Sequence, residues 1–437
     1  MKKIFLSIAV FGTLMSSCEQ FSDGLNTDPN NFTDAPAELV IGQAQLEAIK
    51  LSESQASRYA GLFTDQFSGC ERQYTPYETY TVAAGDFDDT WDDLYADGIA
   101  QAQFVQEKAL EEGTPVLEGV GQIFEAMLFG EAAALFGDVP YTEAGDPIMF
   151  PNPNYDDQAA VLTGVQSILS EAIANVGNAK VANAFGGTIF VGNDATWGQI
   201  AHSLKARYFL IAKDYTGAYN ESLLGINAAS ADLLARHGPN TGEKNLYYQF
   251  TVEQRDGYLG ICNEPYLLKL LNGSAPRKLT TPGDAKRLAV YFDTANAGIN
   301  TGDGGYFAID ASFPIVNFVE TKLIQAEAAA RIGQDATTPF NAVRTYLAST
   351  YDGAFPPSTA TGDQLLPQIL EEKYISLPGS LQVFHDARRT NNLIGIPVKG
   401  SRNTSIPQRF LYPQVEINAN ANFPGIVELF TPTKVNN

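Results

Sequence analysis

The segment "AALFGDVPYTEA", residues 133–144, joins a helical run of small and apolar residues to a Gly, an Asp and a Pro. Gly137 can adopt the left-handed conformation that closes a helix, and Pro140 cannot continue one. Asp138 can hydrogen-bond to backbone groups in the turn that follows. We therefore predict a helix end followed by a fixed turn, with Asp138 and Tyr141 in local contacts, rather than an active-site loop.

Helical periodicity extends along the chain on both sides of this segment. Apolar residues at three- and four-residue steps predict helices at 37–67, 87–111, 117–136, 157–176, 195–213, 227–236, 316–332, 338–350, 363–376 and 379–390. Several of these runs form pairs joined by short turns, but no clean 34-residue repeat signature is present. The length of 437 residues allows two or three domains, or one large helical domain with insertions.

Two stretches lack helical periodicity. Residues 69–86 hold several Tyr and a Pro and predict an extended loop or short strands, while 238–315 is rich in Gly, Asn, Pro, Thr and Tyr. The second stretch is interpreted as a large irregular insertion with small strands. Loops commonly carry binding residues, so these two stretches are the first places to search for a ligand site.

The charge balance excludes one class of partner. The chain has 28 Lys and Arg against 50 Asp and Glu, for a formal net charge of -22. Nucleic-acid binding needs a basic surface that this composition lacks. A polyanionic ligand is disfavoured for the same reason, whereas a neutral or cationic ligand is compatible.

The N-terminus has the pattern of an export signal. Lys2 and Lys3 precede "IFLSIAVFGTLM", an apolar stretch too short to span a bilayer as a stable helix. "SSC" then places small residues before Cys18, as in a bacterial lipoprotein signal. We expect 1–17 to be removed and 18–36 to form a tether lipidated at Cys18, for example with palmitate. The alternative is an ordinary signal with an incidental Cys, and no second apolar run of spanning length is expected.

The opening segment also carries a family resemblance. "FGDVPYTEA" resembles the helix-end segment of the SusD/RagB family of nutrient-binding outer-membrane lipoproteins. In a later matching segment, 197–210, His202 stands where that family usually has Asn. Seven further segments resemble the family in the same order, namely "LNTDPNNFTDA" (25–35), "WDDLYADGIAQA" (91–102), "YDDQAAVLTGVQSILSEAI" (155–173), "WGQIAHSLKARYFL" (197–210), "FVETKLIQAEAAAR" (318–331), "ILEEKYISLPGSLQVFHDARRTN" (369–391) and "IPQRFLYPQVEINANANFP" (406–424). The similarity covers nearly the whole mature chain and is closest to a divergent branch of the family.

The resemblance implies a mostly α protein: a right-handed helical scaffold of tetratricopeptide-like helix pairs, with ligand loops outside it. It implies a single SusD-like domain over 37–437 that contains the insertion at 238–315. Proteins of this family are anchored by lipid on the outer face of the outer membrane. They bind glycans, or in some cases peptides, catalyse nothing, and deliver the ligand to a SusC-like TonB-dependent transporter.

Catalytic and metal motifs are absent from the sequence. The three His residues form no HExxH, and no CxxC is present. The Asp cluster within 86–97 lacks the Gly of a calcium-binding EF-hand loop and is interpreted as a helix start matched to the helix dipole. We predict no catalytic metal and no cofactor; the Asp- and Asn-rich loops leave a structural calcium open as an alternative that no motif supports. Cys70 and Cys262 either form a disulfide or remain two buried thiols.

Aromatic residues in the loops are the candidate ligand contacts. A sugar presents flat C–H faces to an exposed ring and hydroxyls to polar side chains. Six Tyr meet the requirement of lying in the two irregular stretches: Tyr74, Tyr77, Tyr80, Tyr247, Tyr248 and Tyr258. The alternative is that these rings only pack the insertion onto the helices. Peptide capture, an exported helical glycosidase and a ligand-free protein scaffold remain the competing functions.

Overall fold

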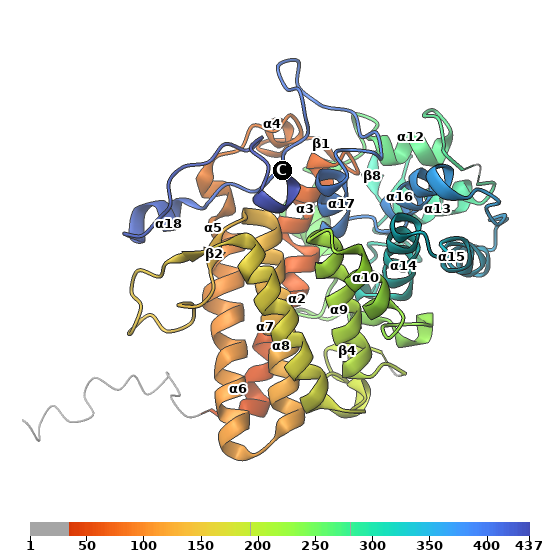
Figure 1. The fold of residues 1–437 in the computed structure, drawn as a ribbon. Helices are drawn as coiled ribbons and strands as arrows, with labels where there is room; N and C mark the ends of the chain where they lie inside the picture. The colour runs from red at the N-terminus through yellow and green to blue at the C-terminus, as the bar shows by residue number, and fades with distance from the viewer. Residues whose placement is uncertain (1–34, 193, 280) are drawn as a thin grey trace, which may run out of the picture.

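The computed structural model describes residues 35–192, 194–279 and 281–437. The predicted signal peptide, Cys18 and nearly all of the tether lie outside these residues. The described chain is mostly helical, as predicted, with small sheets at the edges of the helical scaffold (Figure 1).

The first half of the chain forms nine described α-helices, which include most of the long ones. They are α2 (Ala37–Glu53), α3 (Gln55–Phe63), α4 (Tyr74–Glu78), α5 (Asp88–Asp92), α6 (Ala100–Glu112), α7 (Pro115–Phe136), α8 (Gln158–Val176), α9 (Trp197–Ile211) and α10 (Tyr215–Ser222). A π-helix (Asp93–Ile99) joins α5 to α6. The later helices are α11 (Leu246–Tyr248), α12 (Tyr266–Asn272), α13 (Asp284–Tyr291), α14 (Phe318–Ile332), α15 (Thr337–Thr350), α16 (Leu365–Ser376), α17 (Leu381–Arg389) and α18 (Gln414–Ala419).

The strands are short and belong to three sheets. The first has the order β1-β6-β8-β7, from β1 (Ser68–Gly69), β6 (Leu259–Gly260), β8 (Gly298–Ile299) and β7 (Phe292–Asp293). The second pairs β2 (Val139–Pro140) with β3 (Tyr155–Asp156). The third has the order β4-β5-β9, from β4 (Phe190–Val191), β5 (Leu233–Ala235) and β9 (Phe313–Val316).

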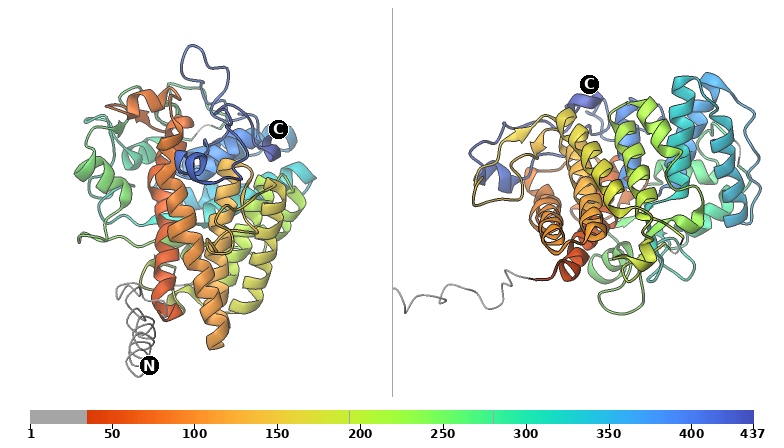
Figure 2. Two further views of the ribbon diagram at one scale, coloured as in Figure 1. Left: turned by 90° about the vertical axis from the view of Figure 1, so that its left-hand side faces the viewer. Right: turned by 60° about the horizontal axis from the view of Figure 1, so that its bottom comes forward.

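The long helices pack as neighbouring pairs. α7 contacts α6 and α8, α9 contacts α8 and α10, and α14 contacts α10, α15 and α16. The helices of the first half lie on one side of the molecule, and α14–α16 lie with α12 and α13 on the other (Figures 1 and 2). This arrangement agrees with the predicted helix hairpins, and it leaves the insertion outside the helical scaffold.

The helix end at Gly137 is confirmed. Gly137 has φ 91°, so α7 stops there, and β2 begins two residues later. Asp138 bonds over a longer range than predicted: its Oδ1 accepts from the backbone N–H of Gln158 at 3.0 Å, and its carbonyl accepts from Tyr412 Oη at 2.7 Å. Tyr141 sets its ring edge-on against Phe129, 4.9 Å between centroids. The turn therefore fixes where α8 starts as well as where α7 ends.

Several predicted boundaries are wrong. The helix expected over 37–67 is broken at Ser54, which has φ -106° and ψ -134°. The segment 227–236 is strand β5 after a short 3-10 turn, because it pairs with β4 and β9. Helices α4 inside the loop 69–86, α10 beside α9 and α18 near the C-terminus were missed, and the insertion also holds helices α11, α12 and α13.

Two helices, α7 and α8, pass a length and composition test for crossing a membrane, contrary to the expectation of no second apolar run. The apolar window of α7 is completely buried inside the protein, and a third of the α8 window is buried. α7 therefore serves as the central helix of the core, where an apolar sequence all round is expected.

Buried ion pairs join the helices that surround the core. Glu327 of α14 accepts from Arg389 Nη1 of α17 at 2.6 Å, and Asp386 pairs with Lys373 of α16 at 3.0 Å. All four side chains are nearly inaccessible to solvent. Burial alone raises the pKa of Glu327, but the neighbouring Arg389 guanidinium outweighs it and holds the pKa well below its usual value. The Glu327 carboxylate is therefore charged at neutral pH and balances the positive charge of the buried Arg389 guanidinium.

We predict that Glu327→Gln lowers the free energy of unfolding by about 3 kcal/mol at pH 7, because it removes one of the two carboxylates, Glu327 and Asp386, that pair with the buried Arg389 guanidinium. A carboxyl whose pKa is lower in the folded state than in the unfolded state stabilises the folded protein at pH values above its unfolded-state pKa. That stabilisation is lost progressively as the pH falls below about 5. Urea unfolding of the wild type should show this loss, and the variant should show less of it. Exposed Glu112→Gln is the control and should match the wild type; equal pH profiles for Glu327→Gln and wild type would contradict the assignment.

Candidate ligand-binding site

The two loops selected from the sequence, 69–86 and 238–315, meet at the four-stranded sheet. β1 pairs antiparallel with β6, with Ser68 opposite Gly260. β6 in turn pairs with β8 through Gly260 and Gly298, and β7 lies beyond β8. Because β1 follows the turn after α3, this sheet sets the insertion against the end of the first helical segment.

A disulfide locks this junction. Cys70 and Cys262 are bonded across a sequence separation of 192, with Cα atoms 5.8 Å apart, a usual separation for a disulfide. The backbone N–H of Cys70 also donates to the carbonyl of Tyr258 at 2.9 Å. Of the two states that the sequence left open, the structure has the paired one.

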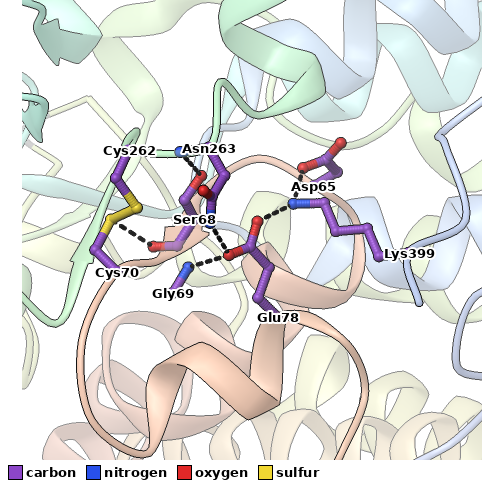
Figure 3. Close-up of a disulfide and its surroundings, with 8 residues drawn as sticks. All are labelled: Asp65, Ser68, Gly69, Cys70, Glu78, Cys262, Asn263 and Lys399. Atoms are coloured by element: carbon purple, nitrogen blue, oxygen red, sulfur yellow. Dashed lines mark hydrogen bonds and ion pairs between the residues drawn. A yellow bond between two sulfur atoms is a disulfide. The ribbon is translucent and has the colours of Figure 1, made fainter. Parts of the chain in front are cut away.

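Glu78 connects three segments beside the disulfide (Figure 3). Its Oε2 accepts from the backbone N–H of Gly69 at 3.1 Å and from Asn263 Nδ2 at 2.7 Å. Its Oε1 pairs with Lys399 of the C-terminal segment, and the same ammonium lies 2.6 Å from Asp65 Oδ1. Burial raises the pKa of Asp65 to about 6, although Lys399 opposes this shift. Lys399 thus joins the C-terminal segment to Asp65 and Glu78, and Glu78 joins the loop 69–86 to the insertion through Asn263.

A hollow of about 350 Å³ opens next to the disulfide, within the size range of small-molecule sites. Its lining combines the disulfide, glycine-rich backbone, apolar side chains and neutral or acidic polar side chains: Cys70, Thr251, Val252, Asp256, Gly257, Leu259, Gly260, Cys262, Asp293, Asn296, Ala297, Gly298, Ile299 and Thr301. None of these described lining residues is Lys or Arg. The hollow therefore offers hydrogen-bonding groups and apolar contact, but no positive charge for an anion.

Asp293 keeps a negative charge at the edge of this hollow. Its Oδ2 accepts from Asn296 Nδ2 at 2.7 Å, and its Oδ1 accepts from the backbone N–H groups of Asn296 and Ala295. These bonds, above all the one from the Asn296 side chain, lower the pKa of Asp293. The hydrogen bonds in the tight turn between β7 and β8 thus favour the charged form of the Asp293 carboxylate.

The structure corrects the expectation that all six selected tyrosines expose their rings. Tyr74, Tyr77 and Tyr80 are at most 9% exposed, and Tyr247 is completely buried. Their hydroxyls bond inside the protein; for example, Tyr247 donates to the carbonyl of Gly379 at 2.8 Å. These four rings pack the loops onto the helices, which was the alternative interpretation.

Aromatic contacts that include two of these tyrosines nevertheless show that the loops 69–86 and 238–315 pack against each other. The rings of Tyr74 and Tyr258 lie 5.9 Å apart, and Phe250 of the insertion stacks at a tilt on Tyr74 at 5.1 Å. Tyr248 and Tyr258 are half-buried and keep accessible ring surface. Of the six predicted contacts, these two stay predicted ligand contacts, and Tyr258 directly adjoins lining residues of the hollow.

Two carboxylates of the acidic segment 86–97, Asp93 and Asp97, form a group with Glu47 of α2, and their oxygens lie within 4.8 Å of one another. Lys50 pairs with Glu47 at 2.7 Å and also with Asp93. Burial raises the pKa of Glu47 to about 7, despite this lysine. The ammonium of Lys50 is thus the cation that this group binds in the structure.

A second, larger groove of about 480 Å³ lies between α8 and α9. Its walls are helix side chains such as Gln166 and Phe209. This groove belongs to the scaffold, whereas the hollow beside the disulfide joins the two irregular stretches. We therefore take the hollow as the candidate site.

Sequence reasoning missed several residues of the site. Lys399 lies more than 300 residues from Glu78, and no local pattern links the two. Asp256, Asn296 and Thr301 are ordinary loop residues by sequence. The one available signal was that each irregular stretch contains a Cys. A predicted Cys70–Cys262 disulfide would have placed the two loops side by side.

We predict that the double variant Cys70→Ser, Cys262→Ser loses about 2–4 kcal/mol of unfolding free energy, because the disulfide restricts a long loop in the unfolded chain. Urea unfolding measures the loss. Treating the wild type with a reductant should give a similar shift, while the same treatment should leave the double variant unchanged. Superimposable curves for wild type and double variant would contradict the prediction.

Comparison with known proteins supports the sequence resemblance. Residues 29–233 match a SusD-like family model described as "Starch-binding associating with outer membrane". No curated protein sequence matches the chain.

Solved structures share the fold over most of the chain. A SusD/RagB family protein from Bacteroides thetaiotaomicron is 18% identical, with 89% of this chain and 95% of that chain covered and a TM-score of 0.64. A chitin-binding protein is 19% identical, with 89% and 95% covered and a TM-score of 0.63. A SusD homolog from Bacteroides uniformis is 15% identical, with 92% and 100% covered and a TM-score of 0.69. Residues 29–233 thus match a SusD-like family model, and most of the chain has the fold of solved SusD-like proteins.

Proposed function

We propose that the protein binds a neutral or amino-bearing oligosaccharide in the hollow beside the Cys70–Cys262 disulfide and catalyses no reaction on it. The observation that carries this proposal is the lining: hydroxyl, amide and carboxylate groups beside apolar side chains, with no Lys or Arg among the described lining residues. Sugar hydroxyls would bond to Asp256, Asn296 and Thr301, and a C–H face would lie against Ile299 and the disulfide.

The family match supports a setting at the cell surface. The matching family model is described as associating with the outer membrane, and one structural neighbour is named a chitin-binding protein. We infer that 37–437 form one domain, anchored by lipid at Cys18 on the outer face of the outer membrane. In this proposal the bound sugar is delivered to a SusC-like TonB-dependent transporter.

Peptide capture is the alternative within binding proteins. A hollow with charged Asp293 and with Asp256 would accept a basic peptide as well as an amino sugar. A peptide brings amide groups and an oligosaccharide brings hydroxyls. A binding screen that includes both classes of ligand can therefore distinguish peptide capture from sugar binding.

We expect calorimetry of the purified mature protein against neutral, amino-bearing and acidic oligosaccharides to show binding of the first two classes only. Asp256→Ala and Tyr258→Ala should each raise the Kd at least about tenfold, equivalent to about 1.4 kcal/mol. Exposed Asp363→Ala, outside the hollow, is the matched control and should bind as the wild type does. Tight binding of acidic sugars, or unchanged affinity in both site variants, would refute the site.

The same screen tests the absence of catalysis. Chromatography of each oligosaccharide after prolonged incubation should recover it intact. Shortened products would instead establish the glycosidase alternative, and binding of basic peptides without any sugar would establish peptide capture.

The lipid anchor has its own test. In cells fed radiolabelled palmitate, the wild-type protein should take up label, and Cys18→Ala should not, because the acylated residue is removed. Label that persists in Cys18→Ala would place the lipid elsewhere or overturn the lipoprotein assignment.

A further inference from the structure

The connection between β2 and β3 presents an unusual apolar tip. It spans 141–154 and projects beside α18, away from the helical scaffold (Figures 1 and 2). Three consecutive apolar residues at its end are open to solvent: Ile148 is 95% exposed, Met149 67% and Phe150 37%. Single exposed apolar residues are ordinary, but a contiguous group marks an interaction site.

The tip is held in one conformation by hydrogen bonds. The carboxylate of Asp146 accepts from the backbone N–H groups of Ile148 and Met149 at 3.1 and 2.8 Å. The carbonyl of Asp146 accepts from the backbone N–H of Phe150 at 2.9 Å. A loop fixed in this way exposes its apolar side chains permanently and loses little conformational entropy on docking.

The base of the loop is also anchored. Asn154 bonds to both carboxylate oxygens of Glu143, and Asn152 accepts from the backbone N–H of Ala421 at 2.7 Å. Asn420 Nδ2 donates to the carbonyl of Pro153 at 3.0 Å. The C-terminal segment therefore braces the loop, and the tip is a rigid projection.

Unpaired negative charge surrounds the tip. A hollow of about 290 Å³ beneath it is lined by Phe150, Tyr95 and three carboxylate residues, Glu143, Asp146 and Glu416, among others. Within the described part of the chain, none of these three carboxylates forms an ion pair. An anionic lipid surface would be repelled by such a rim, whereas Lys or Arg side chains of a protein would be attracted.

We propose that the tip Ile148–Phe150 docks into an apolar recess of a protein partner whose rim carries Lys or Arg side chains. This inference rests on the proposed function, and the partner it specifies is the outer-membrane transporter. The apolar tip supplies the buried contact, and Glu143, Asp146 and Glu416 fix its orientation by pairing with the basic rim.

The test uses the full-length lipoprotein, affinity-tagged and expressed in its own bacterium. Gentle detergent extraction of wild-type cells should recover the TonB-dependent transporter, identified by mass spectrometry. The double variant Ile148→Asp, Met149→Asp should recover at least about tenfold less of it, since removing a central apolar contact typically costs more than a factor of ten. Raising the salt concentration should also weaken the wild-type complex, because salt screens the charged rim.

A matched control separates docking from added charge. The double variant Leu110→Asp, Leu224→Asp changes two leucines outside the tip, 69% and 57% exposed, and should recover the transporter as the wild type does. Thermal melting should show that both double variants stay folded. If the tip variant retains the transporter, or the control loses as much as the tip variant, the docking inference is overturned while the proposed function stands.

Three further outcomes count against the inference. If the wild type recovers no transporter, the proposed partnership itself fails. If the mature protein without lipid binds phosphatidylethanolamine–phosphatidylglycerol vesicles and the tip variant does not, the tip is a membrane contact instead. Insensitivity of the wild-type complex to salt would refute the basic rim.

Discussion

Charge buried between helices sets the geometry on which the rest of the molecule depends. Glu131 of α7 lies 2.7 Å from His385 of α17, Glu327 of α14 pairs with Arg389 of α17, and Arg207 of α9 pairs with Glu320 of α14 at 2.7 Å. Apolar packing is non-directional and tolerates small shifts. A buried ion pair does not, because a displaced partner leaves an uncompensated charge in a low-dielectric interior. These contacts fix how the helices of the first half meet those of the second.

The loops use this frame in different ways. One sheet edge, the disulfide and Lys399 join the end of α3, the insertion and the tail into one structure around a polar hollow. The β2–β3 connection instead turns outward, braced by the C-terminal segment. The molecule thus separates a hollow whose described lining contains no Lys or Arg from an apolar projection. Such a division is what a protein needs if it must hold a small ligand and a large partner at the same time.

Much of the scaffold could be predicted from the sequence, since periodicity and chain punctuation are local. In the structure α7 ends at Gly137, as the Gly and the following Pro140 predict. Most long helices lie within a few residues of their predicted bounds. The exception at 227–236 is instructive. Its apolar spacing fits a helix, but pairing with β4 and β9 gives it a strand conformation, and that pairing depends on residues about forty and eighty positions away. For the candidate site, the structure brings the two selected loops together, but four of the six selected tyrosines are buried. Whether a loop tyrosine faces solvent depends on what packs over it, and Tyr74 and Tyr247 are covered by segments distant in sequence.

The disulfide has a topological consequence. Residues 71–261, between its two cysteines, include α4 to α11, which are eight of the seventeen described α-helices. A single peptide-bond cut anywhere in that span leaves two fragments that are still one covalent molecule, held together by sulfur as well as by the helical packing. A chain displayed outside a cell meets proteases that the cytoplasm does not contain. In such surroundings, one clipped loop would not release half of the protein.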